Sequence, residues 1–263
     1  MAKVKSLHFY PIKGFRGLST RELWLDPDGP RYDRQWMLVN AENRFISLRS
    51  HPVLTTFGLR MDDVEIEIAR SDLGSVSFAL GEHQGESFDV MTFKHPQPAF
   101  EVSGEVSAWL SEALGEKVKL VGLSPESRRQ VSAELNHRFV RFVDSQPLLV
   151  TSQAALAELE SRSGVALSMA RFRPNLVLED VPAHAEDTWS GFKIGALNFK
   201  RTKACVRCKV TTIHPLTGQG AQEPLKTLAT YRRGERGITF GSYYAHLNEG
   251  RVQVGDAVSS SPL

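Results

Sequence analysis

Short runs of alternating apolar and polar residues dominate the chain and predict β-strands. Residues 64–68, Val-Glu-Ile-Glu-Ile, alternate strictly, as expected for a strand with one buried face. Residues 4–10, 21–25 and 33–39 form similar runs, and turn-forming stretches such as Pro27-Asp28-Gly29-Pro30 separate them. Many short strands at this spacing are typical of a barrel or a sandwich.

Three segments carry the spacing of an amphipathic helix instead. From Ser103, a suitable N-cap, apolar residues recur on one face as far as Gly115, which can end the helix. A second helix is predicted from about Ser152 towards Gly164. A third, weaker one covers residues 224–231, with a proline in its first turn. The chain is therefore expected to be β-rich with a few helices.

Chain length, net charge and the absence of long apolar stretches indicate how many domains to expect and which kinds of binding partner to exclude. A chain of 263 residues can hold two modest domains, and we place the boundary after the first helix, giving units 1–122 and 123–263. A net charge of +2, with both signs interspersed, does not favour binding to a nucleic-acid polymer. No stretch approaches the roughly 20 apolar residues that span a bilayer, and the first residues lack the apolar part of a signal peptide. We expect a soluble, cytoplasmic protein that does not bind membranes.

The two cysteines of the chain form a Cys-Val-Arg-Cys segment, Cys205 to Cys208, between predicted strands at 197–203 and 209–213. A structural zinc site needs four ligands, and the histidines show no paired spacing that would complete one. A thioredoxin-like pair stands at a helix N-terminus, whereas the β-branched residues here favour a strand. Two thiols without a role, and one thiolate that ligates a soft redox metal held by a cofactor, both remain open.

The longer pattern around these cysteines is informative. It reads Ala204-Cys205-Val206-Arg207-Cys208-Lys209-Val210-Thr211-Thr212-Ile213, followed by Pro215 and Thr217-Gly218. This pattern resembles the core motif of the MOSC domain, which molybdenum-cofactor sulfurases share with the mitochondrial amidoxime-reducing component. Further segments resemble the same family, in its order: Tyr10-Pro11-Ile12-Lys13-Gly14, Asp33-Arg34-Gln35-Trp36-Met37, Arg171-Phe172-Arg173-Pro174-Asn175 and Phe240-Gly241-Ser242-Tyr243. Together they cover nearly the whole chain.

The resemblance implies a β-rich α+β fold. A MOSC N-terminal β-barrel module, residues 1–122, would pack against a MOSC β-barrel domain, residues 123–263, with a few helices. The molybdenum cofactor, a molybdenum–molybdopterin, would lie between the two.

The resemblance also implies a set of site residues. In the reducing enzymes the cysteine at the position of Cys208 binds molybdenum and is therefore the expected catalytic and metal-binding residue. Lys13, Arg34 and Arg173 match basic contacts to the phosphate and pterin, for which arginine offers a fork and lysine a point charge. Arg49 would border the substrate pocket. The remaining implied cofactor contacts are Gly14, which stands where relatives carry serine, Asp144, Ser145, Asn175, Val206 and Arg207.

The implied activity is a two-electron reduction of N-hydroxylated compounds, which detoxifies amidoximes, hydroxylamines and N-hydroxylated nucleobases. No dinucleotide fingerprint follows a strand, and no cysteines are left for an iron–sulfur domain. Electrons would therefore come from a separate ferredoxin, flavodoxin or reductase. Two alternatives stay open: a carrier of the cofactor or of sulfur, in which Cys205 holds a persulfide, and a cofactor-free protein that binds a partner.

Overall fold

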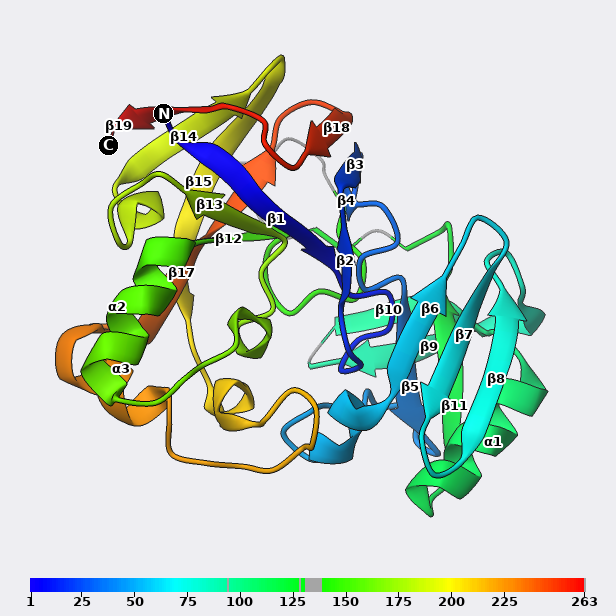
Figure 1. Ribbon diagram of the computed structural model, residues 1–263. Coiled ribbons are helices and arrows are strands. Elements are labelled where there is room, and N and C mark those ends of the chain that lie inside the picture. Colours follow the sequence, from blue (N-terminus) through cyan, green and yellow to red (C-terminus); the bar gives the residue numbers. More distant parts are fainter. Residues whose placement is uncertain (94, 128, 131–138, 263) are drawn as a thin grey trace.

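The largest sheet has nine strands and extends from β19, at the upper left of Figure 1, to β2 near the middle of the molecule. The computed structural model describes residues 1–93, 95–127, 129–130 and 139–262. Eight strands of the sheet follow one another in the order β19-β14-β15-β17-β12-β13-β1-β2, and β16 pairs with β17 beside this row. Their bounds are Val258–Pro262 for β19, Trp189–Ile194 for β14, Leu197–Val206 for β15, Gly237–His246 for β17, Leu148–Ser152 for β12, Leu176–Glu179 for β13, Lys3–Phe9 for β1, Leu18–Thr20 for β2 and Arg233–Gly234 for β16.

Three smaller sheets complete the β-structure of the described residues. One has the order β5-β11-β10-β9, formed by Trp36–Asn40, Val118–Leu123, His95–Glu101 and Gln84–Thr92. A second joins β18 (Gly250–Gln253), β3 (Glu22–Asp26) and β4 (Gly29–Pro30). The third joins β6 (Gly58–Met61), β7 (Glu65–Arg70) and β8 (Gly74–Ala79).

The β-rich α+β class is confirmed, but the expected closure into barrels is wrong. Across the described part of the chain, each sheet is an open row with two end strands that do not pair with each other. In two of the sheets one end strand is short, since β2 has three residues and β4 has two. Edges of this length offer too few backbone groups for a continuous ladder back to the opposite end.

Strands from the first 30 residues pair with strands from the last 90. β1 lies antiparallel to β13, and β3 lies antiparallel to β18. Val4 and Leu7 of β1 are fully buried, which anchors this strand in the large sheet. The pairing places the loop after β1 beside the segment before β13, and His8 N donates to Asn175 O at 2.9 Å. Residues far apart in sequence thereby meet between the two halves. The linear boundary near residue 122 stays a prediction.

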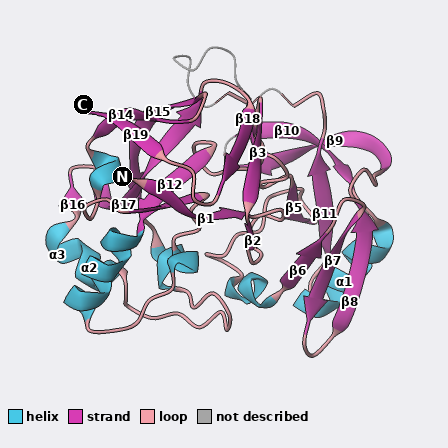
Figure 2. Ribbon diagram, turned by 45° about the horizontal axis from the view of Figure 1, so that its top comes forward, coloured by secondary structure: helices cyan, strands magenta, loops and turns pink. Residues whose placement is uncertain are grey.

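The three α-helices of the described part begin and end close to the predicted residues: α1 is Gly104–Leu114, α2 is Gln153–Ser163 and α3 is Leu225–Tyr231. Ser152 Oγ caps α2 by accepting from Ala155 N, and Gly164 ends it with a φ of 69°. Figure 2 shows α1 at one side of the molecule and α2 with α3 at the other. None of these helices combines the length and apolarity needed to cross a membrane.

Two large apolar cores lie on either side of the region where the halves meet. One gathers Phe15, Trp36 and Phe57 with α1, and the other gathers Phe192 and Tyr244 on the large sheet. Each core holds aromatic pairs, such as Phe15 with Phe57 at 5.0 Å between ring centroids. The polar segments between the cores are therefore held by rigid packing on both sides.

Two predicted strands differ from the structure. Residues 33–35 form a turn, and β5 begins only at Trp36. Residues 209–213 were expected as a strand, but Lys209–Thr212 form the 3₁₀-helix η5. Thr211 Oγ1 donates to Cys208 O at 3.1 Å, and Thr212 Oγ1 donates to Lys209 O at 2.7 Å. These threonine hydroxyls satisfy carbonyls three residues back, which stabilises a helical turn despite the β-branched side chains.

Candidate functional site

One cleft between the two halves brings together every predicted cofactor contact. Its empty space is about 930 Å³, including its opening to solvent. Arg49 also lines this cleft, and its guanidinium lies 5.4 Å from the centre of the Phe93 ring. The predicted contacts that line it are Lys13, Gly14, Arg34, Asp144, Ser145, Arg173, Asn175, Val206, Arg207 and Cys208. We call it the first cleft.

The two cysteines have different surroundings in this cleft. Cys208 follows the end of β15 and is exposed, whereas Cys205 is 2% exposed. Arg207 Nη1 donates to Cys205 Sγ at 2.7 Å, and its Nη2 donates to Phe172 O at 2.8 Å. Arg207 thus fixes the turn that carries Cys208. The Cys208 thiol is the one available to a ligand in the cleft.

Arg34 and Arg173 form a pair of cations around one aromatic ring. Their guanidinium carbons lie 4.3 and 4.2 Å from the centre of the Tyr10 ring. Both residues adopt a left-handed backbone conformation, with φ of 49° and 55°, which is uncommon for residues other than glycine. Backbone strain of this kind is often concentrated at functional sites. Tyr10 OH donates to Pro174 O at 3.1 Å, so the ring is fixed as well.

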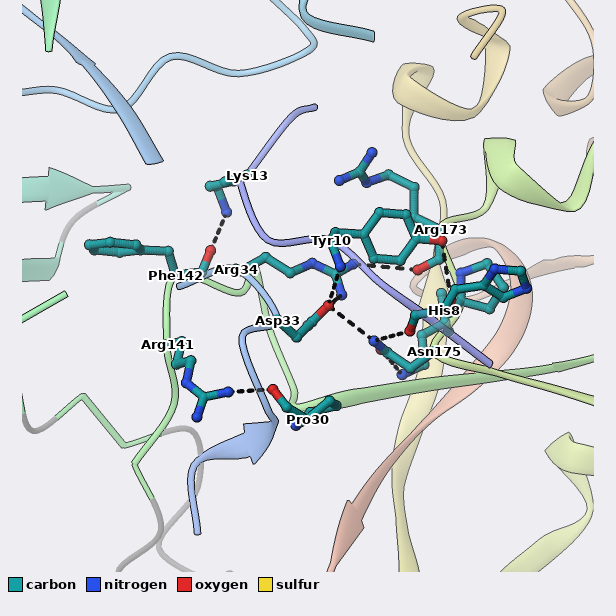
Figure 3. A network of polar contacts seen from close by, with 12 residues as sticks. His8, Tyr10, Lys13, Pro30, Asp33, Arg34, Arg141, Phe142, Arg173 and Asn175 are labelled. Atoms are coloured by element: carbon teal, nitrogen blue, oxygen red, sulfur yellow. Dashed lines mark hydrogen bonds and ion pairs between the residues drawn. The ribbon is translucent and has the colours of Figure 1, made fainter. Parts of the chain in front are cut away.

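A buried carboxylate organises this arginine pair (Figure 3). Asp33, 1% exposed, accepts from Tyr10 N at 2.8 Å and lies 2.5 Å from Arg34 Nη1. Asn175 Nδ2 also donates to Asp33, at 3.2 Å, and Asn175 Oδ1 accepts from Leu149 N at 3.1 Å. Asn175 therefore lines the cleft, while its amide holds Asp33 and β12 in place.

The arginine pair leaves an excess of positive charge. Arg173 donates to Phe15 O at 2.7 Å, and within the described residues it has no carboxylate within ion-pair distance. Burial, followed by the neighbouring Arg34, lowers the pKa of Arg173 to about 10. A guanidinium whose charge is disfavoured in this way is stabilised by an incoming anion. This is the property expected of a site for phosphate.

Lys13 and Asp144 form an ion pair at one side of the cleft. Lys13 Nζ donates to Phe142 O at 2.7 Å and pairs closely with the Asp144 carboxylate. Burial alone would raise the pKa of Asp144, but Lys13 and Arg34 lower it to about 2. The Asp144 side chain is 62% exposed, so an ionised carboxylate faces the cleft at neutral pH. It can accept hydrogen bonds from a pterin edge, but it carries no proton to deliver.

Gly14 permits close approach of the backbone to a ligand. Its φ is 92°, and a Cβ at this position would stand 3.0 Å from Leu54 Cδ1. Both facts favour glycine at this position. The group that Gly14 offers to an anion is therefore its backbone N–H.

Three residues that shape the site were not predicted to have a role. Tyr10 and Asp33 stood inside the quoted motifs, beside Lys13 and Arg34, which was the available signal. Tyr243 also lines the first cleft, and burial raises the pKa of its hydroxyl.

The described residues contain no group of three or more His, Cys, Asp or Glu side chains arranged to hold a metal ion. A metal bound at Cys208 would take its other ligands from a cofactor. The exposed thiol, the unpaired cation Arg173 and the size of the cleft fit a molybdenum–pterin group with a phosphate.

Comparison with known proteins agrees with this geometry. Residues 1–117 match the model of the MOSC N-terminal beta barrel domain, and residues 137–259 match that of the MOSC domain. The chain is 31% identical to mitochondrial amidoxime-reducing component 1 of Mus musculus, over 97% of the chain and 81% of that protein. The Homo sapiens protein of that name is 29% identical, over 97% and 82%. Molybdenum cofactor sulfurase of Oryza sativa is 30% identical, over 98% of the chain and 35% of that longer protein. The chain belongs to the MOSC family.

Proposed function

We propose that the protein binds a molybdenum–pterin cofactor in the first cleft through Cys208 and reduces N-hydroxylated compounds. The observation that carries this proposal is an exposed thiol at a cleft that also contains a partly buried cation without a carboxylate partner among the described residues, Arg173. Family membership supports a function related to the molybdenum cofactor. The printed name of the mouse and human relatives points to amidoximes as a substrate class.

Different residues of the first cleft would bind different parts of the cofactor. The cofactor, when bound, supplies two-electron redox chemistry at Cys208. Arg34, Arg173 and the Gly14 N–H would bind its phosphate, together with the N–H group of Lys13 that Phe142 and Asp144 leave free. Asp144 would accept hydrogen bonds from the pterin.

The overall reaction balances with an external source of electrons. An amidoxime takes up two electrons and two protons and yields an amidine and water. Hydroxylamines and N-hydroxylated nucleobases are reduced in the same way, which would detoxify them. We propose a separate electron-transfer protein as donor, such as a ferredoxin, a flavodoxin or a reductase, in the cytoplasm.

The test measures molybdenum and benzamidoxime reduction together. Wild-type protein from a host that makes the cofactor should hold near-stoichiometric molybdenum and should reduce benzamidoxime with a chemical electron donor. Cys208→Ala should lose activity by about a hundredfold or more, with part of the metal kept by the phosphate contacts. The absence of metal in the wild type, and of turnover after reconstitution, would refute the proposal.

A carrier of the cofactor or of sulfur is the second candidate. The observation that favours it is Cys205, whose sulfur lines the same cleft and accepts from Arg207. Similarity to a molybdenum cofactor sulfurase also supports it. Cys205→Ala separates the two functions. A reductase would keep most of its benzamidoxime activity in this variant, whereas a persulfide carrier would lose sulfur transfer.

A further inference from the structure

A second cleft, with about 1280 Å³ of empty space, lies against the first. Residues from β1, from the loop before β2 and from the two 3₁₀-helices η3 (Met169–Arg171) and η5 line it. Leu48, Arg173 and Val210 line both clefts, so they form the wall between them. Val210 follows Cys208 by two residues, which places this wall beside the proposed reaction site.

The second cleft is basic and lacks acidic lining residues. Its lining includes Arg16, Arg171 and Arg173, and no aspartate or glutamate. Within the described part of the chain, none of these three guanidiniums forms an ion pair with a carboxylate. The first cleft differs in having an acidic lining residue, Asp144, which pairs with Lys13. Since Arg173 is assigned to the phosphate of the cofactor, an anionic ligand in the second cleft would compensate the charge of Arg16 and Arg171.

Backbone carbonyls hold two of these arginines in place while leaving donors free. Arg16 Nε donates to Thr55 O at 3.0 Å and its Nη2 donates to Thr56 O at 3.3 Å. Arg171 Nη1 donates to Thr211 O at 3.3 Å. A guanidinium has five N–H donors, so each keeps others for a ligand. Burial lowers the pKa of Arg171, and an anion would reverse that effect.

A histidine between two serines adds a neutral donor. His8 Nε2 lies 2.9 Å from Ser6 Oγ, and His8 Nδ1 lies 3.0 Å from Ser19 Oγ. Burial lowers the pKa of His8, so the ring is neutral at pH 7. A neutral ring donates from one nitrogen and accepts at the other. The serine that accepts from the ring therefore keeps its hydroxyl proton for a ligand.

Apolar side chains also line the second cleft. Met169, Ile213 and Leu216 contribute side chains, and Leu216 is 58% exposed. This combination of guanidinium groups with free donors and apolar surface suits a ligand in which an anionic group is attached to a cyclic organic molecule.

We propose that the second cleft binds the phosphate of N-hydroxylated nucleotides, whose base reaches the first cleft past Arg173. The nature of the reacting group rests on the proposed function, whereas phosphate binding does not. Phosphorylated N-hydroxylated nucleosides are then preferred over their unphosphorylated forms.

Calorimetric titration with cytidine 5′-monophosphate and with cytidine tests the binding step without turnover. The purified holoprotein, whose first cleft holds the cofactor, should bind the nucleotide about ten- to a hundredfold more tightly than the nucleoside, as expected for charge-assisted hydrogen bonds. Arg16→Met and Arg171→Met should each remove most of this preference. Arg60→Met is the matched control, because its side chain is 88% exposed and does not line the second cleft.

Three outcomes would overturn the proposal. Equal affinity for nucleotide and nucleoside would remove the phosphate site. A preference kept by both Arg16→Met and Arg171→Met, if both variants fold as judged by circular dichroism, would do the same. A preference abolished by Lys13→Met alone would assign the phosphate to the first cleft.

A kinetic measurement separates this proposal from the proposed function. With N4-hydroxycytidine and its 5′-monophosphate as substrates, the nucleotide should have the lower KM, by about tenfold. A protein that binds the nucleotide through Arg16 and Arg171 but reduces neither compound would retain the binding site and refute the reductase.

Discussion

Two carboxyl groups with shifted pKa values, one exposed to a cleft and one fully buried, show how two regions of the molecule treat charge differently. Asp144 lies in the first cleft, where Lys13 and Arg34 overcome burial and lower its pKa to about 2. Glu186 lies in the 3₁₀-helix η4 (Ala185–Asp187), which contacts β12 and β17. It is 0% exposed, and burial with help from Asp187 raises its pKa to about 7. The surroundings of Asp144 favour the ionised carboxylate, whereas the surroundings of Glu186 favour the protonated carboxyl group.

This difference identifies which buried polar group belongs to a ligand site. Cations that exceed their acidic partners, as around Arg173, gain from an added anion. A carboxyl group that gains a proton instead, such as Glu186, lowers the local charge without any ligand. A shifted pKa alone would have marked both groups, whereas the sign of the shift and its cause separate them.

The largest effect on the free energy of unfolding is expected at Asp33, the buried carboxylate that pairs with Arg34. Asp33→Asn breaks the pair with Arg34 and weakens the bonds to Tyr10 N and Asn175. The free energy of unfolding should fall by about 3 to 5 kcal/mol, as for other broken buried pairs. Urea unfolding measures this. Asp72→Asn, which removes an exposed pair with Arg70, is the control and should change stability little. Similar losses in both variants would contradict this account of Asp33.

In the second region, removing the carboxylate charge should increase the free energy of unfolding instead of lowering it. The folded pKa of Glu186 is raised from 4.5 to about 7, so its ionisation destabilises the folded state as pH rises through this window. Glu186→Gln should therefore leave stability nearly unchanged at pH 4 and increase it by ~3 kcal/mol at pH 8. Urea unfolding at a series of pH values checks this. A difference between variant and wild type that does not change with pH would show that Glu186 does not titrate in this window.

A smaller effect is expected at Asp144. Its lowered pKa means that its stabilisation is present above pH 4 and is lost as pH falls towards 2. Asp144→Asn should lower the free energy of unfolding at pH 7 by about 1 kcal/mol, a value discounted because the side chain is 62% exposed. The same titration measures it. An increase in stability at pH 7, as expected for Glu186→Gln, would remove the contrast between the two regions.

The family resemblance named residues that the structure brings together in the first cleft, and all of them except Asp144 and Ser145 stand in short motifs. The roles of Tyr10 and Asp33 could not be predicted, because they depend on Arg34 and Arg173, which come from loops 139 residues apart. The turn at Lys209 was missed for a local reason, since threonine hydroxyls outweighed β-propensity there. The second cleft could not be predicted from the sequence either, because β1, η3 and η5, which line it, are far apart in the chain and meet only in the folded protein.

The helices were predicted well, because their caps are local signals. Ser152 and Gly164 bound α2 as expected from their residue types. Barrel closure failed as a prediction, because it depends on which edge strands find partners. The alternation of residues along a single strand carries no information about that.

The central claim is that the Cys208 sulfur is a ligand of the metal. X-ray absorption at the molybdenum edge tests it directly, with wild-type protein, Cys208→Ser and the control Cys205→Ser. The account predicts one fewer sulfur neighbour of molybdenum in Cys208→Ser and an unchanged number in Cys205→Ser. An unchanged sulfur count in Cys208→Ser with the metal retained, or a loss confined to Cys205→Ser, would contradict it.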